Sequence, residues 1–191
     1  MSAPNPILVL YAHPAPHRSR VHRALGAAIR ELPGITVRDL YEEYPNFDID
    51  VAREQALLRQ HAVVVYQHPI YWYSTPAIIQ EWQEAVLTRG FAYGPGGTAL
   101  RGKALTQALS TGAAPESYRR GAEHGFSLSE ILRPVEQTAR FCGMDYLAPF
   151  VVQGVGGLDT ATLERQARRY RSHLEQLRDG PLPAPFSSQG D

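Results

Sequence analysis

Two short, uninterrupted runs of apolar residues constrain the fold of this chain more than any other feature. Residues 7–11 read ILVLY and residues 63–66 read VVVY. A strand with one face in water alternates apolar and polar residues, whereas a continuous apolar run is typical of a strand that is buried on both faces. Such strands belong to parallel sheets that carry helices on each side, so the two runs predict an α/β fold.

Strand-like and helix-like segments alternate along the rest of the chain. Further strands are expected at residues 35–40, 103–109 and 146–153, and helices at 19–32, 51–60, 76–87, 128–141 and 159–177. Five strands that alternate with helices predict a flavodoxin-like three-layer sandwich, in which a parallel sheet of order 2-1-3-4-5 has helices on both faces. This order brings the loops after strands one, three and four to one edge of the sheet.

Length and composition fit one domain, expected at residues 1–180, with a disordered or extended tail at 181–191. Nineteen basic and nineteen acidic residues cancel, which argues against nucleic acid and anionic membranes as partners. We find no apolar run of membrane-spanning length and no basic leader, so neither direct membrane insertion nor a signal peptide is expected. The single cysteine, Cys142, excludes an internal disulfide, and we expect no metal site.

The loop after the first strand favours an anionic group. It reads AHPAPHRS and leads into a helix whose N-terminal N–H groups and dipole attract negative charge. His13, His17, Arg18, Ser19 and Arg20 are potential donors to a phosphate, and the glycine-rich phosphate motifs are absent from this loop. The alternative is that Ser19 only caps the helix and the basic side chains are solvated.

Three adjacent aromatic residues, Tyr71, Trp72 and Tyr73, follow the third strand. Aromatic side chains at the carboxyl end of a parallel strand suit a planar ligand, because ligands of open α/β sheets bind at that edge. Packing in the core or in an interface between subunits is the alternative for some of these rings.

The loop after the fourth strand offers hydroxyl groups and a flexible backbone. Ser110 and Thr111 are hydroxyl donors, and Gly112 permits a close approach of the backbone to a ligand. Tyr118 and His124 follow in the same loop and are each able to donate a proton. Taken alone, this pair is a weak signal, and ordinary solvent-exposed loop residues are the better interpretation of it.

Several segments together resemble a known family. These are YAHPAPHRS at 11–19, QHPIYWYSTPAIIQEW at 67–82, GFAYGPGGTALRGK at 90–103, STG at 110–112 and FCGMDYLAPF at 141–150. They resemble the NAD(P)H:quinone reductase family of flavodoxin-like flavoproteins. Within that family they are most similar to the ancillary oxidoreductase subunits of bacterial glutathione-regulated potassium-efflux systems. The resemblance spans about residues 7–177 in order.

The resemblance implies a cytoplasmic homodimer with a flavin at the subunit interface, FMN being favoured over FAD. It implies transfer of a hydride from NAD(P)H to flavin N5 and then to a quinone or similar flat electrophile, by a ping-pong mechanism. Residues matching the family pattern around the flavin are His13, Ser19, Arg20, Val21, Ile70, Tyr71, Trp72, Tyr73, Ser110, Thr111, Gly112 and Ala113, and those matching its catalytic pair are Tyr118 and His124. Ala113 stands where the family usually has a second glycine.

Two other classes of function remain open at this stage. One is a regulatory subunit that activates a potassium-efflux antiporter and reaches the inner membrane only through that partner. The other is a flavodoxin-type electron carrier, although such carriers are commonly acidic monomers and this chain is neutral.

Overall fold

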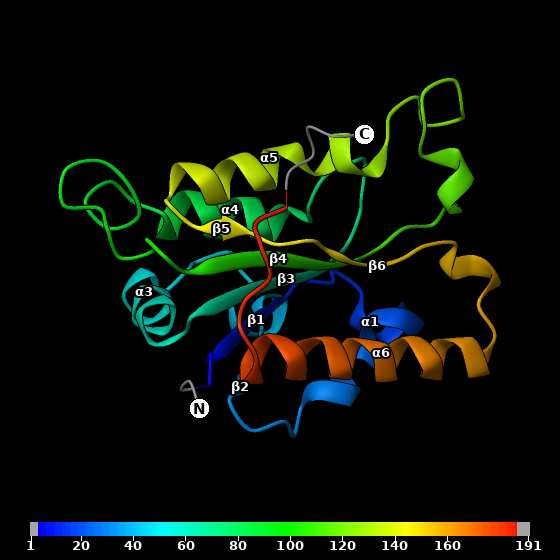
Figure 1. Ribbon diagram of the computed structural model, residues 1–191, viewed down its shortest axis with the longest axis horizontal. Helices are drawn as coiled ribbons and strands as arrows, with labels where there is room; N and C mark the ends of the chain where they lie inside the picture. The colour runs from blue at the N-terminus through cyan, green and yellow to red at the C-terminus, as the bar shows by residue number, and fades with distance from the viewer. Residues whose placement is uncertain (1–3, 187–191) are drawn as a thin grey trace.

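The computed structural model describes residues 4–186 and contains one parallel sheet between two layers of helices (Figure 1). The strands are β1 (Ile7–Tyr11), β2 (Ile35–Asp39), β3 (Val63–Pro69), β4 (Ala104–Ser110), β5 (Asp145–Tyr146) and β6 (Phe150–Val152). Their order is β2-β1-β3-β4-β5, and β6 also pairs with β4. The predicted strand order is therefore confirmed, with a sixth strand added.

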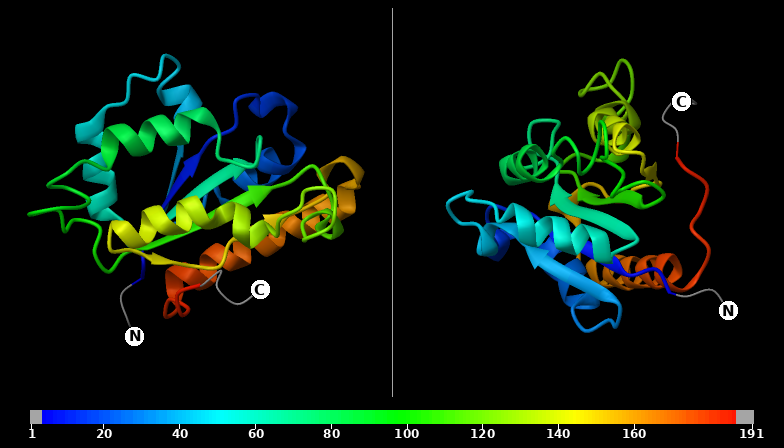
Figure 2. Two further views of the ribbon diagram at one scale, coloured as in Figure 1. Left: turned by 90° about the horizontal axis from the view of Figure 1, so that it is seen from above. Right: turned by 90° about the vertical axis from the view of Figure 1, so that its left-hand side faces the viewer.

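Helices cover both faces of the sheet (Figure 2). One layer contains α1 (Arg20–Ile29) and α6 (Thr160–Asp179), and the other contains α3 (Val51–Gln60), α4 (Ala77–Val86) and α5 (Leu128–Phe141). The short helix α2 (Leu40–Glu43) follows β2 directly and was not expected from the sequence. Three 3₁₀ turns complete the description: η1 (Pro16–Arg18), η2 (Pro115–Ser117) and η3 (Val155–Gly157).

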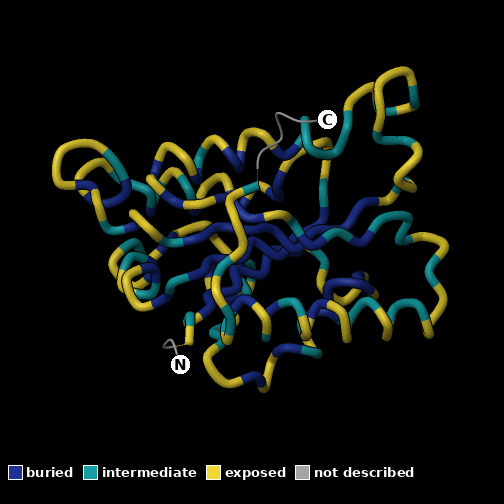
Figure 3. The backbone as a smooth tube through the Cα atoms, viewed as in Figure 1, coloured by how far each residue is buried: buried dark blue, intermediate teal, exposed yellow. Residues whose placement is uncertain are grey.

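The continuous apolar strands divide their side chains between two cores. Leu8 and Leu10 of β1 pack into the core under α3, α4 and α5, whereas Ile7 and Val9 pack into the core under α1 and α6. This division follows from the two-residue period of a strand. Burial is concentrated in the sheet, and exposed residues lie on the outer helix faces and in the loops at both ends (Figure 3). The two-sided burial predicted from the apolar runs is therefore present.

The last predicted strand, 146–153, is interrupted. Pro149 lies between β5 and β6 and has no N–H with which to continue the ladder. The hydroxyl of Thr106, in the neighbouring strand β4, donates instead to the carbonyl of Ala148 at 3.0 Å. The break is therefore bridged by a side chain that belongs to a different strand.

The described part of the C-terminal tail, residues 181–186, has no helix or strand and passes from α6 toward the α5 layer at the edge of the sheet (Figures 1 and 2). The N–H of Phe186 donates to the carbonyl of Tyr146 at 2.7 Å, and the two rings meet edge to face. The expected tail at 181–191 thus begins as an extended segment that is tied to β5, and its last five residues lie outside the described chain.

Candidate functional site

A cleft of about 260 Å³ opens where β1, β3 and β4 end. The strands are in parallel register, with Tyr11 beside Gln67 and Pro69 beside Ser110, so the three following loops lie at one edge. The cleft is lined by predicted residues from all three loops, namely His13, Ser19, Arg20, Val21, Ile70, Tyr71, Ser110 and Gly112. Arg18, which was predicted only as a potential phosphate donor, completes the lining together with Pro69 and Val155, which were not predicted.

The N-terminus of α1 forms one wall of this cleft. Ser19 is the N-cap, and its Oγ accepts a hydrogen bond from the N–H of His22 at 3.0 Å. The N–H groups of Arg20 and Val21 belong to the first turn, where a helix has no internal acceptors for them. The Ser19 hydroxyl is both a cap and part of the lining, so the two interpretations of this residue are compatible.

His13 is buried at the base of the same wall. Its Nδ1 accepts a hydrogen bond from the N–H of Ala15 at 3.1 Å, so the proton of the neutral ring is on Nε2. Burial lowers the pKa of His13 below its ordinary value. The ring is therefore a neutral hydrogen-bond donor near neutral pH.

The aromatic loop contains a tight, strained turn. Tyr71 and Ser74 exchange two backbone hydrogen bonds of 3.0 Å, and the residues between them, Trp72 and Tyr73, have φ values of 48° and 62°. Positive φ at both central positions is the pattern of a type I′ turn, which glycine and asparagine normally occupy. Each non-glycine residue in this region costs of order 1–3 kcal/mol. The turn carries the Trp72 side chain on its outside, where it is 93% exposed.

Two of the predicted cofactor residues after β4, Thr111 and Ala113, bond within the loop and do not line the cleft. The Thr111 side chain is buried, and its Oγ1 donates to the carbonyl of Ala113 at 2.9 Å. The same carbonyl accepts from the N–H of Gly154. Gly112 lies on the cleft wall between them, and a Cβ atom built there meets nothing within 4 Å. The open space at Gly112 thus leaves room for a ligand against the backbone.

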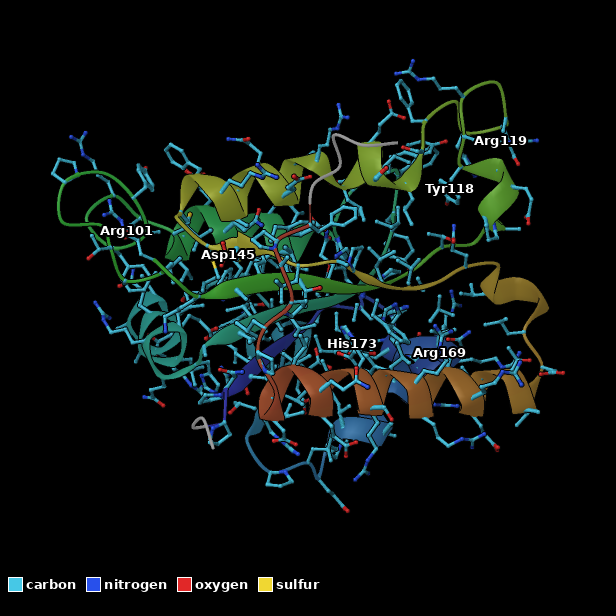
Figure 4. The ribbon with its side chains drawn as sticks, in the orientation of Figure 1. Arg101, Tyr118, Arg119, Asp145, Arg169 and His173 are labelled. Atoms are coloured by element: carbon cyan, nitrogen blue, oxygen red, sulfur yellow. The ribbon has the colours of Figure 1, made fainter. Side chains whose placement is uncertain are left out.

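Tyr118 lies on the segment that projects beyond the carboxyl ends of the strands (Figure 4), and His124 belongs to the same loop between β4 and α5. Their rings stack with centroids 4.5 Å apart, and neither residue lines the 260 Å³ cleft. Tyr73 connects them to the aromatic turn, because its hydroxyl is 3.3 Å from Nδ1 of His124. The predicted catalytic pair is therefore in contact with one of the predicted ring-binding residues. The two residues that meet, Tyr73 and His124, are 51 positions apart in the sequence.

Two negative findings concern membranes and metals. Among the described helices, not one has the length and apolar character required to cross a membrane. Residues 4–186 also contain no group of three or more His, Cys, Asp or Glu side chains arranged to hold a metal ion.

Comparison with known proteins assigns the family. A family model described as flavodoxin-like fold matches residues 5–174. This chain belongs to that family. It is 43% identical over 183 residues to the glutathione-regulated potassium-efflux system ancillary protein KefG of Pectobacterium atrosepticum, covering 96% of this chain and 98% of KefG.

Solved structures of two relatives have the same fold. General stress protein 14 of Treponema denticola, crystallised in complex with FMN, is 40% identical with a TM-score of 0.85, covering 90% of this chain and 99% of that chain. An NADPH-quinone reductase from P. pentosaceus is 33% identical with a TM-score of 0.79, covering 87% of this chain and 96% of that chain. The resemblance to quinone reductases and to potassium-efflux ancillary proteins is thus confirmed at the level of family and relatives.

Proposed function

We propose that this protein is an FMN-dependent NAD(P)H:quinone oxidoreductase. The observation that carries the proposal is the cleft itself, which joins a helix N-terminus, two serine hydroxyls and an aromatic turn at the edge where β1, β3 and β4 end. A helix N-terminus suits a phosphate, and a neighbouring aromatic surface suits a flat ring. FMN is preferred to FAD because a relative with 40% identity was crystallised with FMN.

The residues of the cleft fit the phosphate end of this cofactor. Ser19 and the free N–H groups of Arg20 and Val21 supply uncharged donors at the positive end of α1. The Arg18 side chain adds a cation to the lining, and neutral His13 adds a further donor. The set contains donors matched to phosphate oxygens and needs no glycine-rich motif.

The aromatic side fits the ring and the substrates. Ile70 donates its N–H to the carbonyl of Ser110 at 2.9 Å, which fixes the start of the aromatic loop against β4. Tyr71 lines the cleft, and the exposed Trp72 and Tyr73 extend the aromatic surface beyond it. Bound FMN supplies the hydride chemistry that links NAD(P)H to a quinone or similar flat electrophile in two half-reactions.

Tyr118 and His124 are proposed to assist that hydride transfer. The two rings are stacked, and the Tyr73 hydroxyl lies 3.3 Å from Nδ1 of His124, so a phenol and an imidazole that can each donate a proton or a hydrogen bond lie together. Their role is electrostatic and acid–base, and binding of the cofactor is assigned to the cleft residues.

A homodimer is part of this proposal. The apolar rings of Trp72 and Phe126 are 93% and 60% exposed in the single chain, and exposed aromatic surface is typical of an interaction site. A second copy would bring further residues to the ring side of the cleft. Sedimentation equilibrium is expected to give twice the mass of the chain, and a flavin-loaded monomer would contradict the interface site.

Purification and an enzyme assay test the proposal directly. The purified protein is expected to be yellow, with FMN as the flavin released on denaturation and identified by mass. It is expected to oxidise NADH or NADPH with a quinone in repeated turnovers, with parallel lines in double-reciprocal plots. A protein that binds flavin and is not reduced by NAD(P)H would instead be an electron carrier, and a colourless protein with no flavin affinity would refute the proposal.

An ancillary role is the second candidate. The observation that favours it is the 43% identity to KefG over 96% of the chain. In this role the protein would dock to a potassium-efflux antiporter and reach the inner membrane through that partner. Potassium efflux that depends on the protein, together with co-purification of the antiporter, would support this role, and independence of efflux from the protein would exclude it.

A further inference from the structure

His22 connects the two serine hydroxyls that line the cleft. Its backbone N–H donates to Oγ of Ser19 at 3.0 Å, and its side-chain Nε2 is 2.9 Å from Oγ of Ser110, a residue 88 positions away in the sequence. His22 itself is only 1% exposed. One buried residue of α1 thus fixes a hydroxyl on the helix wall and a hydroxyl at the end of β4.

The protonation state of His22 follows from its surroundings. Burial, together with the nearby His68 and His13 rings, lowers the pKa of His22 well below its ordinary value, so the ring is neutral. The Nδ1 atom is buried and has no hydrogen-bond partner among the described residues. A buried N–H without an acceptor is rarer and costlier than a buried lone pair without a donor. The proton therefore belongs on Nε2, where it is donated to Ser110.

This tautomer determines what Ser110 offers to a ligand, whereas the backbone N–H of His22 donates to Ser19 in either tautomer. Each Oγ accepts a hydrogen bond from His22, so each hydroxyl proton remains available to the cleft. In the other tautomer the Ser110 proton would point to His22, and only a lone pair would face the ligand. We propose that His22 is a positioning residue that makes Ser19 and Ser110 hydrogen-bond donors toward acceptor atoms of the bound ligand.

The inference rests on the proposed function for the identity of that ligand. FMN carries phosphate oxygens, ribityl oxygens and ring carbonyl groups, all of which accept hydrogen bonds. Donors that are fixed before binding cost less to order than freely rotating hydroxyls, which is the general advantage of preorganisation. His22 contributes to affinity through Ser19 and Ser110.

The tautomer is testable in the flavin-free protein. Nitrogen-15 chemical shifts of the imidazole rings are expected to show His22 as a neutral ring protonated on Nε2 at pH 7.5. A ring protonated on Nδ1, or a charged ring, would overturn the inference whatever the protein is found to bind. This measurement therefore separates the inference from the proposed function.

Variants test the consequence for binding. His22→Phe keeps the backbone bond to Ser19 and removes the side-chain bond to Ser110, and we expect FMN to bind about tenfold more weakly, as for one lost hydrogen bond to a polar ligand group. Ser110→Ala is expected to cost a similar factor, and the double variant no more than either single one. His22→Gln, which retains a side-chain donor, is expected to recover part of the affinity.

His61→Phe is the matched control. His61 is also buried and bonded through both ring nitrogens, to Leu57 and Thr36, but it precedes β3 at the opposite end of the strand. The His61→Phe variant is expected to be less stable than the wild type and to bind FMN with unchanged affinity.

Equal FMN affinity of wild type and His22→Phe, or additive effects of the two single variants, would overturn the inference. If His22→Phe does not fold, Ser110→Ala and the nitrogen-15 spectrum decide the question. Failure of the wild type to bind FMN would refute the proposed function and the binding step together.

Discussion

The hydroxyl of Tyr73 lies 3.3 Å from Nδ1 of His124, with the two rings edge to face. Tyr73 is one of the two residues held at positive φ in the turn after β3, and His124 belongs to the projecting loop after β4. The contact joins the two loops on the open side of the cleft. A substitution that moves one of these loops is therefore expected to change the position of the other.

Replacement of Tyr118 by phenylalanine tests the proposed acid–base role. The ring stack on His124 is retained, but the phenol that donates a proton or hydrogen bond is lost. We expect the rate of flavin reduction by NAD(P)H to fall at least about tenfold, because positioned proton donors contribute 10²–10⁴ in comparable reactions. Stopped-flow absorbance measures this rate, and the flavin content of the purified protein is expected to stay close to that of the wild type. Tyr93→Phe, in the loop that packs on Phe141, is the control, and an unchanged rate in Tyr118→Phe would remove Tyr118 from the mechanism.

Replacement of Trp72 by asparagine tests the strain in the turn. Asparagine tolerates positive φ better than tryptophan does, and the Trp72 side chain buries almost no surface in the single chain. The free energy of unfolding of the monomer is expected to rise by about 0.5–1 kcal/mol, a typical gain for a residue that fits its backbone conformation. Urea unfolding at low protein concentration measures it. A loss of stability would mean that the ring makes contacts that outweigh the backbone cost.

Removal of Glu54 tests the buried ion-pair cluster under α4. Its carboxylate is fully buried and accepts from Arg38 at 3.1 Å, from Tyr44 at 2.7 Å and from Trp82 at 2.9 Å. Glu54→Ala leaves the Arg38 charge without this partner, so the free energy of unfolding is expected to fall by about 3–5 kcal/mol. Glu43→Gln removes the more exposed partner of Arg38 and is expected to cost less. Chemical denaturation of both variants compares them, and equal losses would contradict the assigned burial effect.

Acid is expected to destabilise the flavin-free protein in the range in which histidines titrate. Burial lowers the pKa of both His22 and His68 in the folded protein, so the unfolded chain binds more protons below its histidine pKa near 6.5. The free energy of unfolding should be level above about pH 7.5. It should fall below pH 6.5 by up to about 1.4 kcal/mol per pH unit for each such histidine, down to the folded pKa. Urea titrations between pH 8 and 5 measure the slope, which should be shallower in His22→Phe. An increase of stability with acid in this window would contradict the neutral, buried state of these rings.

The sheet could be predicted well because each strand is recognisable from residues that are neighbours in the sequence. The apolar runs at 7–11 and 63–66 each carry their own evidence of two-sided burial, and the strand order follows from right-handed crossovers. The same reasoning located the three loops, so most of the predicted cofactor residues line one cleft. These features depend on neighbours in sequence or on general topology.

The features that were missed depend on distant partners. The break before β6 occurs at Pro149, but the Thr106 hydroxyl that bridges it belongs to another strand. The bond between His22 and Ser110 spans 88 residues. A histidine three positions after an N-cap serine is, in the sequence alone, no different from an ordinary helical residue. Likewise, Thr111 and Ala113 stand at positions that the family pattern assigns to the flavin, and only the folded loop reveals that the Thr111 hydroxyl donates to the carbonyl of Ala113.

The strained turn has a practical consequence for spectroscopy. The chain has two tryptophans, and they differ to the greatest possible extent: Trp72 is 93% exposed and Trp82 is 1% exposed. Their fluorescence should separate into a long-wavelength component that collisional quenchers reach and a short-wavelength component that they do not. The first reports on anything that covers the aromatic turn, and the second reports only on unfolding. The unmodified protein therefore contains an optical sensor of its proposed binding face and an internal reference for its folded state.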